Sequence, residues 1–457
     1  MFRISKNLCS FSPSGKYLAT VLQNELSIKI SKSGENYHLF TFLDTIEYIE
    51  WCQNDQLILC ASPKKAFIQV FSIKQPEWVF KYTEGSAGID SVSWGPDYKS
   101  LIIISEFKIQ VSILTLDDHR VTHILNLKSS VKHLDANEFS KQLAVIVATN
   151  GEENVEIYKA EGWKLSRKLI CDKLFAIDGI SWSPNGELLG IWCSTIGKSR
   201  LLIYSTVTDS HIGAFSSENN SSIDQLSTSI YANSSEKPVR GIEHVVWSPS
   251  GQLVAIAGNN ETVALVNHIT WSVILQLYCS PVIKDGNYLG RVFKEVDISR
   301  RDWSTFTTST FIIDHHIRYL LEEVHERPIN VLIDGEPKNW EVSIATFDIL
   351  KFSPCGKYLA IRHQVYPTTL WIWDVLEDVV DNILLKNSVS GIAWEPTKTR
   401  LLIFSESSTI IEWKPNKKAT CFESPRGMKV VDGKWNPNGE LIVLVGYNKS
   451  SVICLKD

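Results

Sequence analysis

A short motif recurs along the chain and constrains its fold more than any other feature: an aromatic residue, a small polar residue, proline, a variable residue and glycine. Each copy lies between two apolar runs. Proline fixes φ at the second position of a turn, and glycine suits the fourth position of a type I turn. The motif therefore predicts a tight turn between two antiparallel strands. The five clear copies begin at Phe11, Trp182, Trp247, Phe352 and Trp435.

The spacing of the copies predicts a repeated unit of four strands. Looser copies begin at Trp51, Trp94 and Trp394, and a degenerate copy lies near Leu134. Two segments interrupt the spacing: residues 216–240, a Ser/Asn-rich stretch that we expect to be a flexible loop, and residues 279–342, which lack the motif. Without them nine repeats average about 41 residues, the length of a four-stranded propeller blade. The long insertion has room for a tenth blade, and nine is the preferred count.

The two ends of the chain predict that the last blade is completed by the first strand. After Trp435 the sequence offers two further strands, Leu441–Val445 and Ser451–Leu455. The apolar alternation of Phe2–Ser5 can supply the fourth strand and so remove an open sheet edge. We therefore predict an all-β fold: a single closed β-propeller of about nine four-stranded blades that spans residues 1–457 as one domain.

Charge and hydropathy argue against several classes of partner. The 46 basic and 51 acidic side chains give a formal net charge of −5, which offers no field for nucleic acid. No apolar run reaches the roughly 18–20 residues that span a bilayer, and the N-terminus has no signal-peptide apolar region. The nine cysteines are scattered without a C-x-x-C pair, as expected of reduced, buried thiols. We expect a soluble, cytoplasmic or nuclear protein that is monomeric on its own and binds neither nucleic acid nor membrane.

The residues that could carry catalysis or bind a metal form no recognisable arrangement. No G-x-S-x-G, H-E-x-x-H or G-x-G-x-x-G motif occurs, so we predict no enzyme activity, no catalytic residue and no cofactor. Adjacent histidines on a strand point to opposite faces, so the densest titratable cluster predicts a solvated acidic edge rather than a metal site. That cluster consists of Asp314, His315, His316, Glu322, Glu323, His325 and Glu326.

Two short segments differ from the rest of the blades and are candidates for binding a partner. The first is the run Gln75, Pro76, Glu77 and Trp78, which is followed by the segment Glu84-Gly-Ser-Ala-Gly88. The second is Asn267-His-Ile-Thr-Trp271 at the end of another blade. An exposed tryptophan beside proline or glycine is a common kind of binding hot spot. Packing of each indole between adjacent blades explains the same segments equally well.

The motif and its spacing resemble the WD-repeat propellers. The dipeptide Trp373-Asp374 is the one true WD pair and no Gly-His pair occurs, so the polar network of regular WD blades is not expected in most blades. The two segments above, with the string Tyr366-Pro-Thr-Thr-Leu-Trp-Ile-Trp-Asp374, are similar to the WD-repeat protein 8 family of centrosomes and spindle pole bodies. The stretches from Arg291 to Val296 and from Glu323 to Pro328 lie where that family also interrupts its repeats.

This resemblance implies a non-enzymatic scaffold in the cytoplasm and cytoskeleton, at the microtubule-organising centre, and in the nucleus during mitosis. Members of the family bind a coiled-coil anchoring protein. In fungi they act with a minus-end-directed kinesin-14 to tether microtubule minus ends and support spindle assembly. The candidate partner-binding residues are Gln75, Pro76, Glu77, Trp78, Trp271, Arg291, Glu323 and Arg327.

A propeller of translation initiation is the alternative hypothesis, because such proteins are built from similar Phe-Ser-Pro-x-Gly hairpins and bind ribosomal subunits or initiation factors. Those chains usually add an RNA-recognition domain or a basic C-terminal extension. This sequence ends two strands after its last motif, which favours the spindle-pole hypothesis. An enzyme with its site in the central channel is a third class, which no nucleophile–base pair or carboxylate pair supports.

Overall fold

The computed structural model describes residues 2–4, 8–85, 88–108, 110–128, 132–171, 173–174, 176–195, 199–208, 210–216, 239–284, 289–297, 319–331 and 346–455. In these residues the regular structure is strand, apart from short 3₁₀ turns such as η1 (Pro63–Lys65), η3 (Glu106–Lys108) and η7 (Pro425–Gly427). The chain forms two compact units, one of residues 8–278 and one of residues 1–7 together with 279–457.

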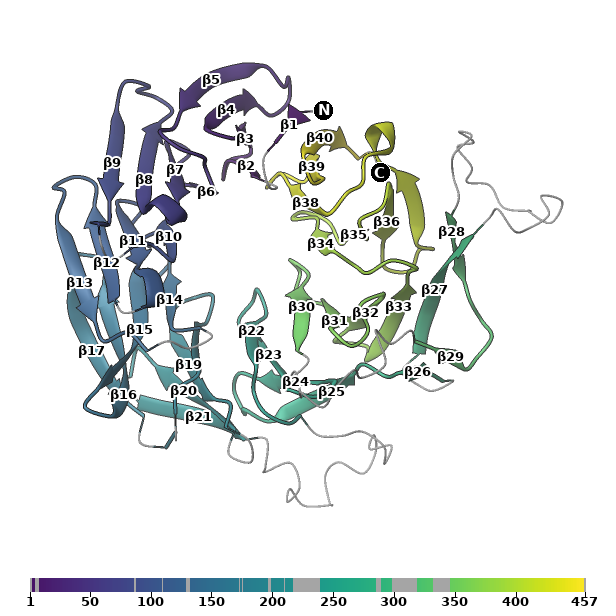
Figure 1. Cartoon of the computed structure of the whole chain (residues 1–457). Helices are drawn as coiled ribbons and strands as arrows, with labels where there is room; N and C mark the ends of the chain where they lie inside the picture. The colour runs from purple at the N-terminus through teal and green to yellow at the C-terminus, as the bar shows by residue number, and fades with distance from the viewer. Residues whose placement is uncertain are drawn as a thin grey trace. The chain divides into compact units, whose positions relative to one another are not determined.

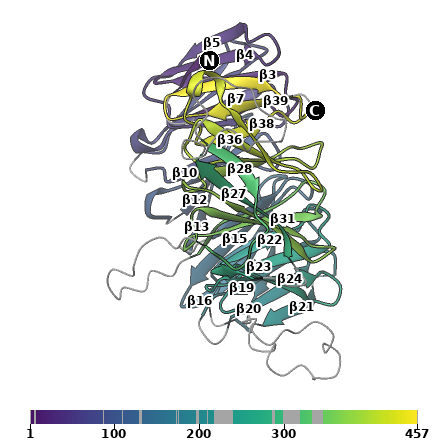
Figure 2. The same cartoon turned by 90° about the vertical axis from the view of Figure 1, so that its right-hand side faces the viewer.

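Six four-stranded antiparallel sheets, blades 1 to 6, make up the unit of residues 8–278, and each is a meander of consecutive strands (Figures 1 and 2). Blade 1 is β2 (Cys9–Phe11), β3 (Tyr17–Leu22), β4 (Glu25–Ile30) and β5 (Asn36–Thr41). Blade 2 is β6 (Tyr48–Trp51), β7 (Leu57–Ser62), β8 (Phe67–Ser72) and β9 (Val79–Thr83). Blade 3 is β10 (Ser91–Trp94), β11 (Ser100–Ile104), β12 (Gln110–Thr115) and β13 (Val121–Leu125).

The other three blades of this unit follow in chain order. Blade 4 is β14 (Leu134–Asn137), β15 (Gln142–Thr149), β16 (Glu152–Lys159) and β17 (Lys164–Ile170). Blade 5 is β18 (Gly179–Trp182), β19 (Leu188–Cys193), β20 (Arg200–Ser205) and β21 (Ser210–Ser216). Blade 6 is β22 (His244–Trp247), β23 (Leu253–Ala257), β24 (Thr262–Asn267) and β25 (Val273–Tyr278).

The second unit contains three further blades. Blade 7 is β30 (Phe347–Phe352), β31 (Tyr358–His363), β32 (Thr369–Asp374) and β33 (Val379–Leu384). Blade 8 is β34 (Gly391–Trp394), β35 (Leu401–Phe404), β36 (Thr409–Trp413) and β37 (Thr420–Glu423). Blade 9 is β38 (Asp432–Trp435), β39 (Leu441–Val445), β40 (Lys449–Cys454) and β1 (Phe2–Arg3). In every blade we call the four strands A to D, in the order of these lists.

Blade 9 is completed from the N-terminus, as predicted. Strand β1 pairs antiparallel with β40, with Phe2 opposite Ser450 and Arg3 opposite Lys449. The Ile4 N–H extends the ladder by donating to the Asn448 carbonyl at 3.2 Å. The predicted fold class is therefore confirmed: the described residues form an all-β chain of nine propeller blades whose last blade takes its D strand from the N-terminus.

The recurrent motif forms the A–B turn of each blade. Its aromatic residue is the last residue of strand A, as with Phe11 in β2 and Trp182 in β18. In blade 1 the Gly15 N–H donates to the Ser12 carbonyl at 2.7 Å, and Gly15 adopts a φ of +74°, which glycine tolerates without steric cost. The Ser12 hydroxyl accepts the Tyr17 N–H at 3.2 Å. Glycine and serine thus each satisfy one requirement of the turn.

Blade 4 carries the degenerate copy, and its register shows which residue replaces the aromatic. In blade 1 Phe11 lies opposite Leu18, and the equivalent pair in blade 4 is Ala136 opposite Leu143. The copy that the sequence placed near Leu134 is therefore centred two residues later, and the aromatic ring is replaced by a methyl group.

Five of the motif tryptophans also tie their blade to the one before it, whereas the indole N–H of Trp247 in blade 6 has no such partner among the described residues. The five indole N–H groups donate to the backbone carbonyl that precedes the equivalent position of the neighbouring blade. In the unit of residues 8–278 these donors are Trp51 to Ser10 at 3.1 Å, Trp94 to Glu50 at 3.2 Å and Trp182 to Asp135 at 3.0 Å. In the second unit they are Trp394 to Lys351 at 3.3 Å and Trp435 to Ala393 at 3.2 Å. The sequence pattern predicted the turn but not this link.

The hydrophobic core lies between neighbouring blades. One buried cluster, for example, joins Leu59 and Ile68 of blade 2 to Leu101 and Ile103 of blade 3. Strands that bury both faces in this way read as continuous apolar runs. Six of the nine cysteines are buried, and Cys60 and Cys193 lie within such runs. All nine cysteines are free thiols.

The long motif-free insertion contributes strands to blade 7, and its described residues do not form a tenth blade. Strand β27 (Leu289–Asp297) pairs in parallel with β33, and β28 (Tyr319–Glu323) pairs antiparallel with β27. We call the β27–β28 pair the strap. A short ladder of β26 (Val282–Ile283) and β29 (Ile329–Asn330) flanks it. Of the other expected insertion, residues 217–238 lie outside the described residues.

Candidate functional site

Arg291, a candidate partner-binding residue, fastens the strap to blades 7 and 8. Its guanidinium pairs with Asp381 of β33 at 2.5 Å, and its backbone N–H donates to the same carboxylate at 2.7 Å. The guanidinium also donates to the Lys417 carbonyl and lies 5.3 Å from the centre of the Phe293 ring. The structure thus gives Arg291 an internal positioning role, and its contact with a partner stays a prediction.

Asp381 is the central acceptor of this attachment. The Trp413 indole of blade 8 donates to its Oδ2 at 2.9 Å, and the carboxylate is buried. Strand β27 can approach this closely because Gly290 has no side chain: a Cβ there would lie 2.5 Å from Asp381 Oδ1. Removing one partner from a buried, hydrogen-bonded ion pair is costly, so the strap is held firmly at this end.

The other two candidates of the insertion lie at the end of the strap. Glu323 is the last residue of β28, opposite Phe293, and is half-buried. The Arg327 guanidinium donates to the backbone carbonyls of Val324 at 2.5 Å and Glu326 at 3.3 Å. Both side chains reach the surface in part, and their role in binding stays a prediction.

The blade 2 candidates form an exposed C–D turn. The Trp78 N–H donates to the Gln75 carbonyl at 2.8 Å, and the Gln75 N–H donates to the Ser72 hydroxyl at 3.1 Å. Every side chain from Gln75 to Trp78 is exposed, and Trp78 retains 37% of its surface. This turn therefore has the exposure that a partner-binding role requires.

Trp271 lies in the C–D turn of blade 6, and of the two interpretations of its indole the structure supports packing between blades, while its role in binding a partner stays a prediction. Only 8% of the residue is accessible. Its ring covers Gly213 of blade 5, where a Cβ would lie 2.0 Å from the indole Cδ1, and its centre is 6.2 Å from that of Trp247. Trp271 is therefore packed between blades, which was the second interpretation of this segment.

The titratable cluster of the insertion is described only in part. Asp314, His315 and His316 lie outside the described residues, whereas Glu322, Glu323, His325 and Glu326 lie within them. Within the described residues no group of three or more His, Cys, Asp or Glu side chains is placed to hold a metal ion. A search of the same residues finds no helix with the length and apolar character needed to cross a membrane.

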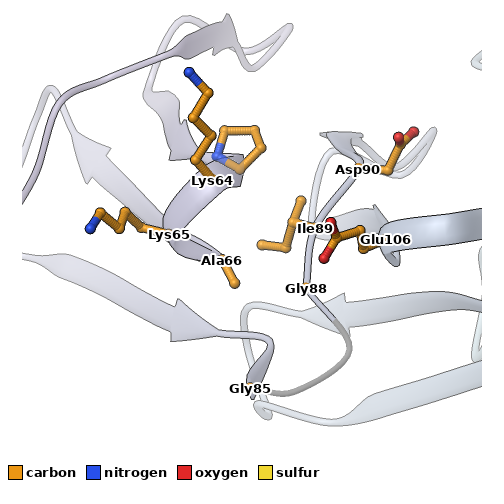
Figure 3. A pocket seen from close by; sticks show the side chains of 9 residues that line it. Lys64, Lys65, Ala66, Gly85, Gly88, Ile89, Asp90 and Glu106 are labelled. Atoms are coloured by element: carbon orange, nitrogen blue, oxygen red, sulfur yellow. The ribbon is translucent and has the colours of Figure 1, made fainter.

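A cleft between blades 2 and 3 was not predicted as a site. It encloses about 570 Å³ and is bounded by the B–C turn of blade 2, the connection between the two blades and the B–C turn of blade 3 (Figure 3). Its lining residues are Pro63, Lys64, Lys65, Ala66, Gly85, Gly88, Ile89, Asp90 and Glu106. The one sequence signal was the segment Glu84–Gly88, singled out above, which contributes two glycines.

The acidic and basic side chains that line this cleft point in different directions. The Glu106 carboxylate lies beside Ile89 and faces the turn of Ala66, whereas the Lys64 and Lys65 ammonium groups point away from it (Figure 3). Gly88 has a φ of +63°, and a Cβ there would lie 2.6 Å from Glu106 Oε2. The missing side chain at Gly88 therefore leaves room for the Glu106 carboxylate directly over the Gly88 backbone.

Comparison with solved structures identifies the class of protein that these blades define. The C-terminal WD40 domain of Sif2 matches 100% of this chain and 97% of that chain with a TM-score of 0.50 and 10% identity. A crystal structure of a eukaryotic initiation factor matches 93% of this chain and 90% of that chain with a TM-score of 0.55 and 10% identity. At 10% identity these likenesses concern the fold alone, and they agree with the blades described above: the chain has the β-propeller fold of WD40 domains.

Comparison with curated proteins gives named relatives within that class. The chain is 29% identical to WD repeat-containing protein WRAP73 of Mus musculus over 428 residues, which cover 91% of this chain and 86% of that protein. It is 22% identical to an uncharacterized WD repeat-containing protein of Schizosaccharomyces pombe over 88% of this chain and 76% of that protein. No protein-family model matches the chain.

Proposed function

We propose that this protein is a non-enzymatic scaffold of the spindle pole or centrosome. It binds a coiled-coil anchoring protein and, through it, a minus-end-directed kinesin-14 that tethers microtubule minus ends. The observation that carries this proposal is the similarity to WRAP73, because it extends over 91% of this chain. WRAP73 is another name for WD-repeat protein 8, whose family the sequence motifs resemble.

The architecture suits such a role. Inter-blade indoles and buried apolar runs hold the strands, while the connecting turns are free to carry binding residues. The exposed turn from Gln75 to Trp78 offers an acidic residue and an aromatic residue side by side. We propose that the protein is monomeric on its own, acts at the microtubule-organising centre and contacts neither nucleic acid nor membrane.

The translation-initiation alternative gains no support from the solved initiation factor. At 10% identity that likeness concerns the fold alone. A shared propeller fold serves many unrelated functions, so the spindle-pole proposal is retained as the single candidate.

Native affinity purification of the tagged full-length chain, followed by mass spectrometry, tests the proposal. Co-recovery of a coiled-coil pole protein, with or without kinesin-14, is the expected result. Recovery of small ribosomal subunits and initiation factors in its place would overturn the proposal and leave the fold unchanged.

The blade 2 turn is tested with the double variant Glu77→Lys, Trp78→Ala. Loss of an aromatic anchor and reversal of its neighbouring charge are expected to lower partner recovery about tenfold, while the thermal unfolding midpoint is kept. Val207→Ala is the matched control, since Val207 lies in the C–D turn of blade 5 and is 73% exposed. Undiminished recovery with the folded double variant would remove this turn from the binding surface.

A further inference from the structure

The cleft between blades 2 and 3 has the features of a recognition site for one cationic side chain. We propose that it binds a protein partner through an arginine or lysine inserted beside Glu106, while an apolar neighbour of that residue packs on Phe107. This inference rests on the proposed function only in taking the partner to be a protein.

Phe107 is the first reason. It lies in the B–C turn of blade 3, directly after Glu106, and is 81% exposed. Its backbone is left-handed, with φ +60° and ψ +8°, and Lys108 follows with φ +54°. A side chain other than Gly, Asn or Asp costs roughly 1–2 kcal/mol in this region. An exposed aromatic ring on such a backbone is a candidate for a binding role.

The turn that carries Phe107 is firmly built. The Lys108 N–H donates to the Ser105 carbonyl at 3.0 Å. The Ser105 hydroxyl donates to the Gln110 carbonyl at 3.2 Å and accepts the Gln110 N–H at 3.0 Å. The position of the ring is therefore fixed before binding, which lowers the entropy that a partner must overcome.

The charge of the cleft selects the partner. Glu106 and Asp90 are exposed and have no ion-pair partner among the described residues, and the Glu106 carboxylate lies over Gly88. Ala66 and the buried Ile89 supply apolar surface for the methylene stem of an inserted side chain. A guanidinium or ammonium would therefore find a carboxylate acceptor and an apolar wall together.

The rim of the cleft limits what else can bind. Lys64, which pairs with Glu47 at 3.1 Å, and Lys65 line the cleft together with Glu106 and Asp90, so its surface is mixed in charge. A polyanion would meet Glu106 and Asp90, whereas a polypeptide can place one basic residue inward and acidic residues against the lysines. The volume of about 570 Å³ is enough for one long side chain and part of its neighbours.

The test uses the full-length protein in its own cells, with the photo-crosslinking residue p-benzoylphenylalanine in place of Phe107. Crosslinked peptides are identified by mass spectrometry. The expected result is a partner segment with an arginine or lysine within one helical turn of the crosslink. A crosslink to nucleic acid or lipid, a segment without a basic residue, or no crosslink would overturn the proposal.

The affinity of the crosslinked partner is then measured with purified proteins. Phe107→Ala and Glu106→Gln are each expected to weaken binding at least about tenfold. Glu106→Arg should abolish binding, and exchange of the partner's basic residue for glutamate should restore it. The matched controls are Phe139→Ala, whose ring is 80% exposed in the A–B turn of blade 4, and Glu161→Gln in the C–D turn of that blade. Equal affinity of cleft variants and controls would overturn the proposal.

These readouts separate the cleft from the proposed function. If the purification recovers a coiled-coil pole protein but Phe107 gives no crosslink to a basic segment, the cleft proposal fails and the scaffold function stands. If Phe107 crosslinks to a basic segment but the purification recovers ribosomal subunits and initiation factors in place of the pole protein, the cleft proposal stands and the spindle-pole function fails.

Discussion

Two B–C turns of neighbouring blades each place two consecutive residues in the left-handed region, but they differ in length and in the residues that adopt it. In blade 4 Asn150 and Gly151 have φ values of +55° and +83°, and in blade 3 Phe107 and Lys108 have φ values of +60° and +54°. In blade 4 these residues form a two-residue hairpin between Thr149 and Glu152, for which Asn-Gly is the preferred pair because both residues tolerate the left-handed region. In blade 3 the turn is longer and contains a 3₁₀ turn, and its left-handed residues, Phe107 and Lys108, are ones that this region disfavours. The difference is the reason for proposing a binding role for the blade 3 turn and none for the blade 4 turn.

The largest expected effect concerns the attachment of blade 3, which carries Phe107, to blade 2. Trp94→Ala removes a buried ring of blade 3 and its hydrogen bond to the Glu50 carbonyl of blade 2. A loss of roughly 3–5 kcal/mol in the free energy of unfolding is expected. Thermal unfolding and solubility measure it, and Trp94→Phe should retain most of the stability. A midpoint unchanged in Trp94→Ala would show that the indole does not hold the blade.

Exchange of the two turns tests the comparison directly. Asn150→Phe with Gly151→Lys gives blade 4 the unfavourable pair, and a loss of about 1–3 kcal/mol is expected from the strain at both positions. Denaturant unfolding measures the change. The double variant should gain no partner, because the neighbouring cleft and its carboxylate are absent there. A stability equal to that of the wild type would show that a left-handed backbone at phenylalanine costs no measurable free energy of unfolding.

The reverse exchange has a smaller effect of opposite sign. Phe107→Asn with Lys108→Gly relieves the strain in blade 3, so the free energy of unfolding should rise by roughly 1 kcal/mol. Binding of the crosslinked partner should fall at the same time, because the apolar contact is lost. A gain in stability without a loss of binding would show that the aromatic ring is not used.

The smallest expected effect is a pH dependence of the stability, which comes from Glu50 of blade 2 where it contacts blade 3. Burial raises the pKa of Glu50 above its ordinary value, against the opposing effect of the Trp94 N–H that it accepts at 3.1 Å. The folded state therefore binds the carboxyl proton of Glu50 more tightly than the unfolded state does. The resulting stabilisation is present below the ordinary glutamate pKa and is lost as the pH rises through the raised pKa.

Glu50→Gln cannot ionise, but its amide oxygen can still accept the Trp94 N–H. The variant should unfold at a slightly higher temperature than the wild type at neutral pH, and the advantage should shrink in mildly acidic buffer. A lower midpoint at neutral pH would mean that the ionised carboxylate stabilises the fold.

Much of the fold was predictable because it depends on local chemistry. The five-residue motif that begins at Phe11 predicts a turn by itself, because its proline and glycine stand at fixed positions. The number of times the motif recurs predicts the number of blades. The pairing of β1 with β40 followed from counting strands. Blade 4 was harder, because Ala136 retains the register without the ring that marks it.

The sites were less predictable because they depend on residues far apart in the sequence. Whether Trp271 is exposed depends on the missing side chain of Gly213 in another blade. The strap depends on Arg291 and Asp381, which the fold brings together from separate segments. The cleft combines three loops, and the phenylalanine between Glu106 and Lys108 does not reveal from its sequence alone that its ring faces water.

The pairing of β1 with β40 has a consequence for how the protein is made. Phe2 is synthesised before blade 1, yet its partner Ser450 follows only after blades 1 to 8. Residues 8–278 can complete their six blades during translation, whereas blade 9 cannot close until β40 has been synthesised. Until then strand β1 has no partner in blade 9, so we expect a chaperone that recognises unpaired strands to bind it at this stage, and a chain truncated before β40 to leave it unpaired.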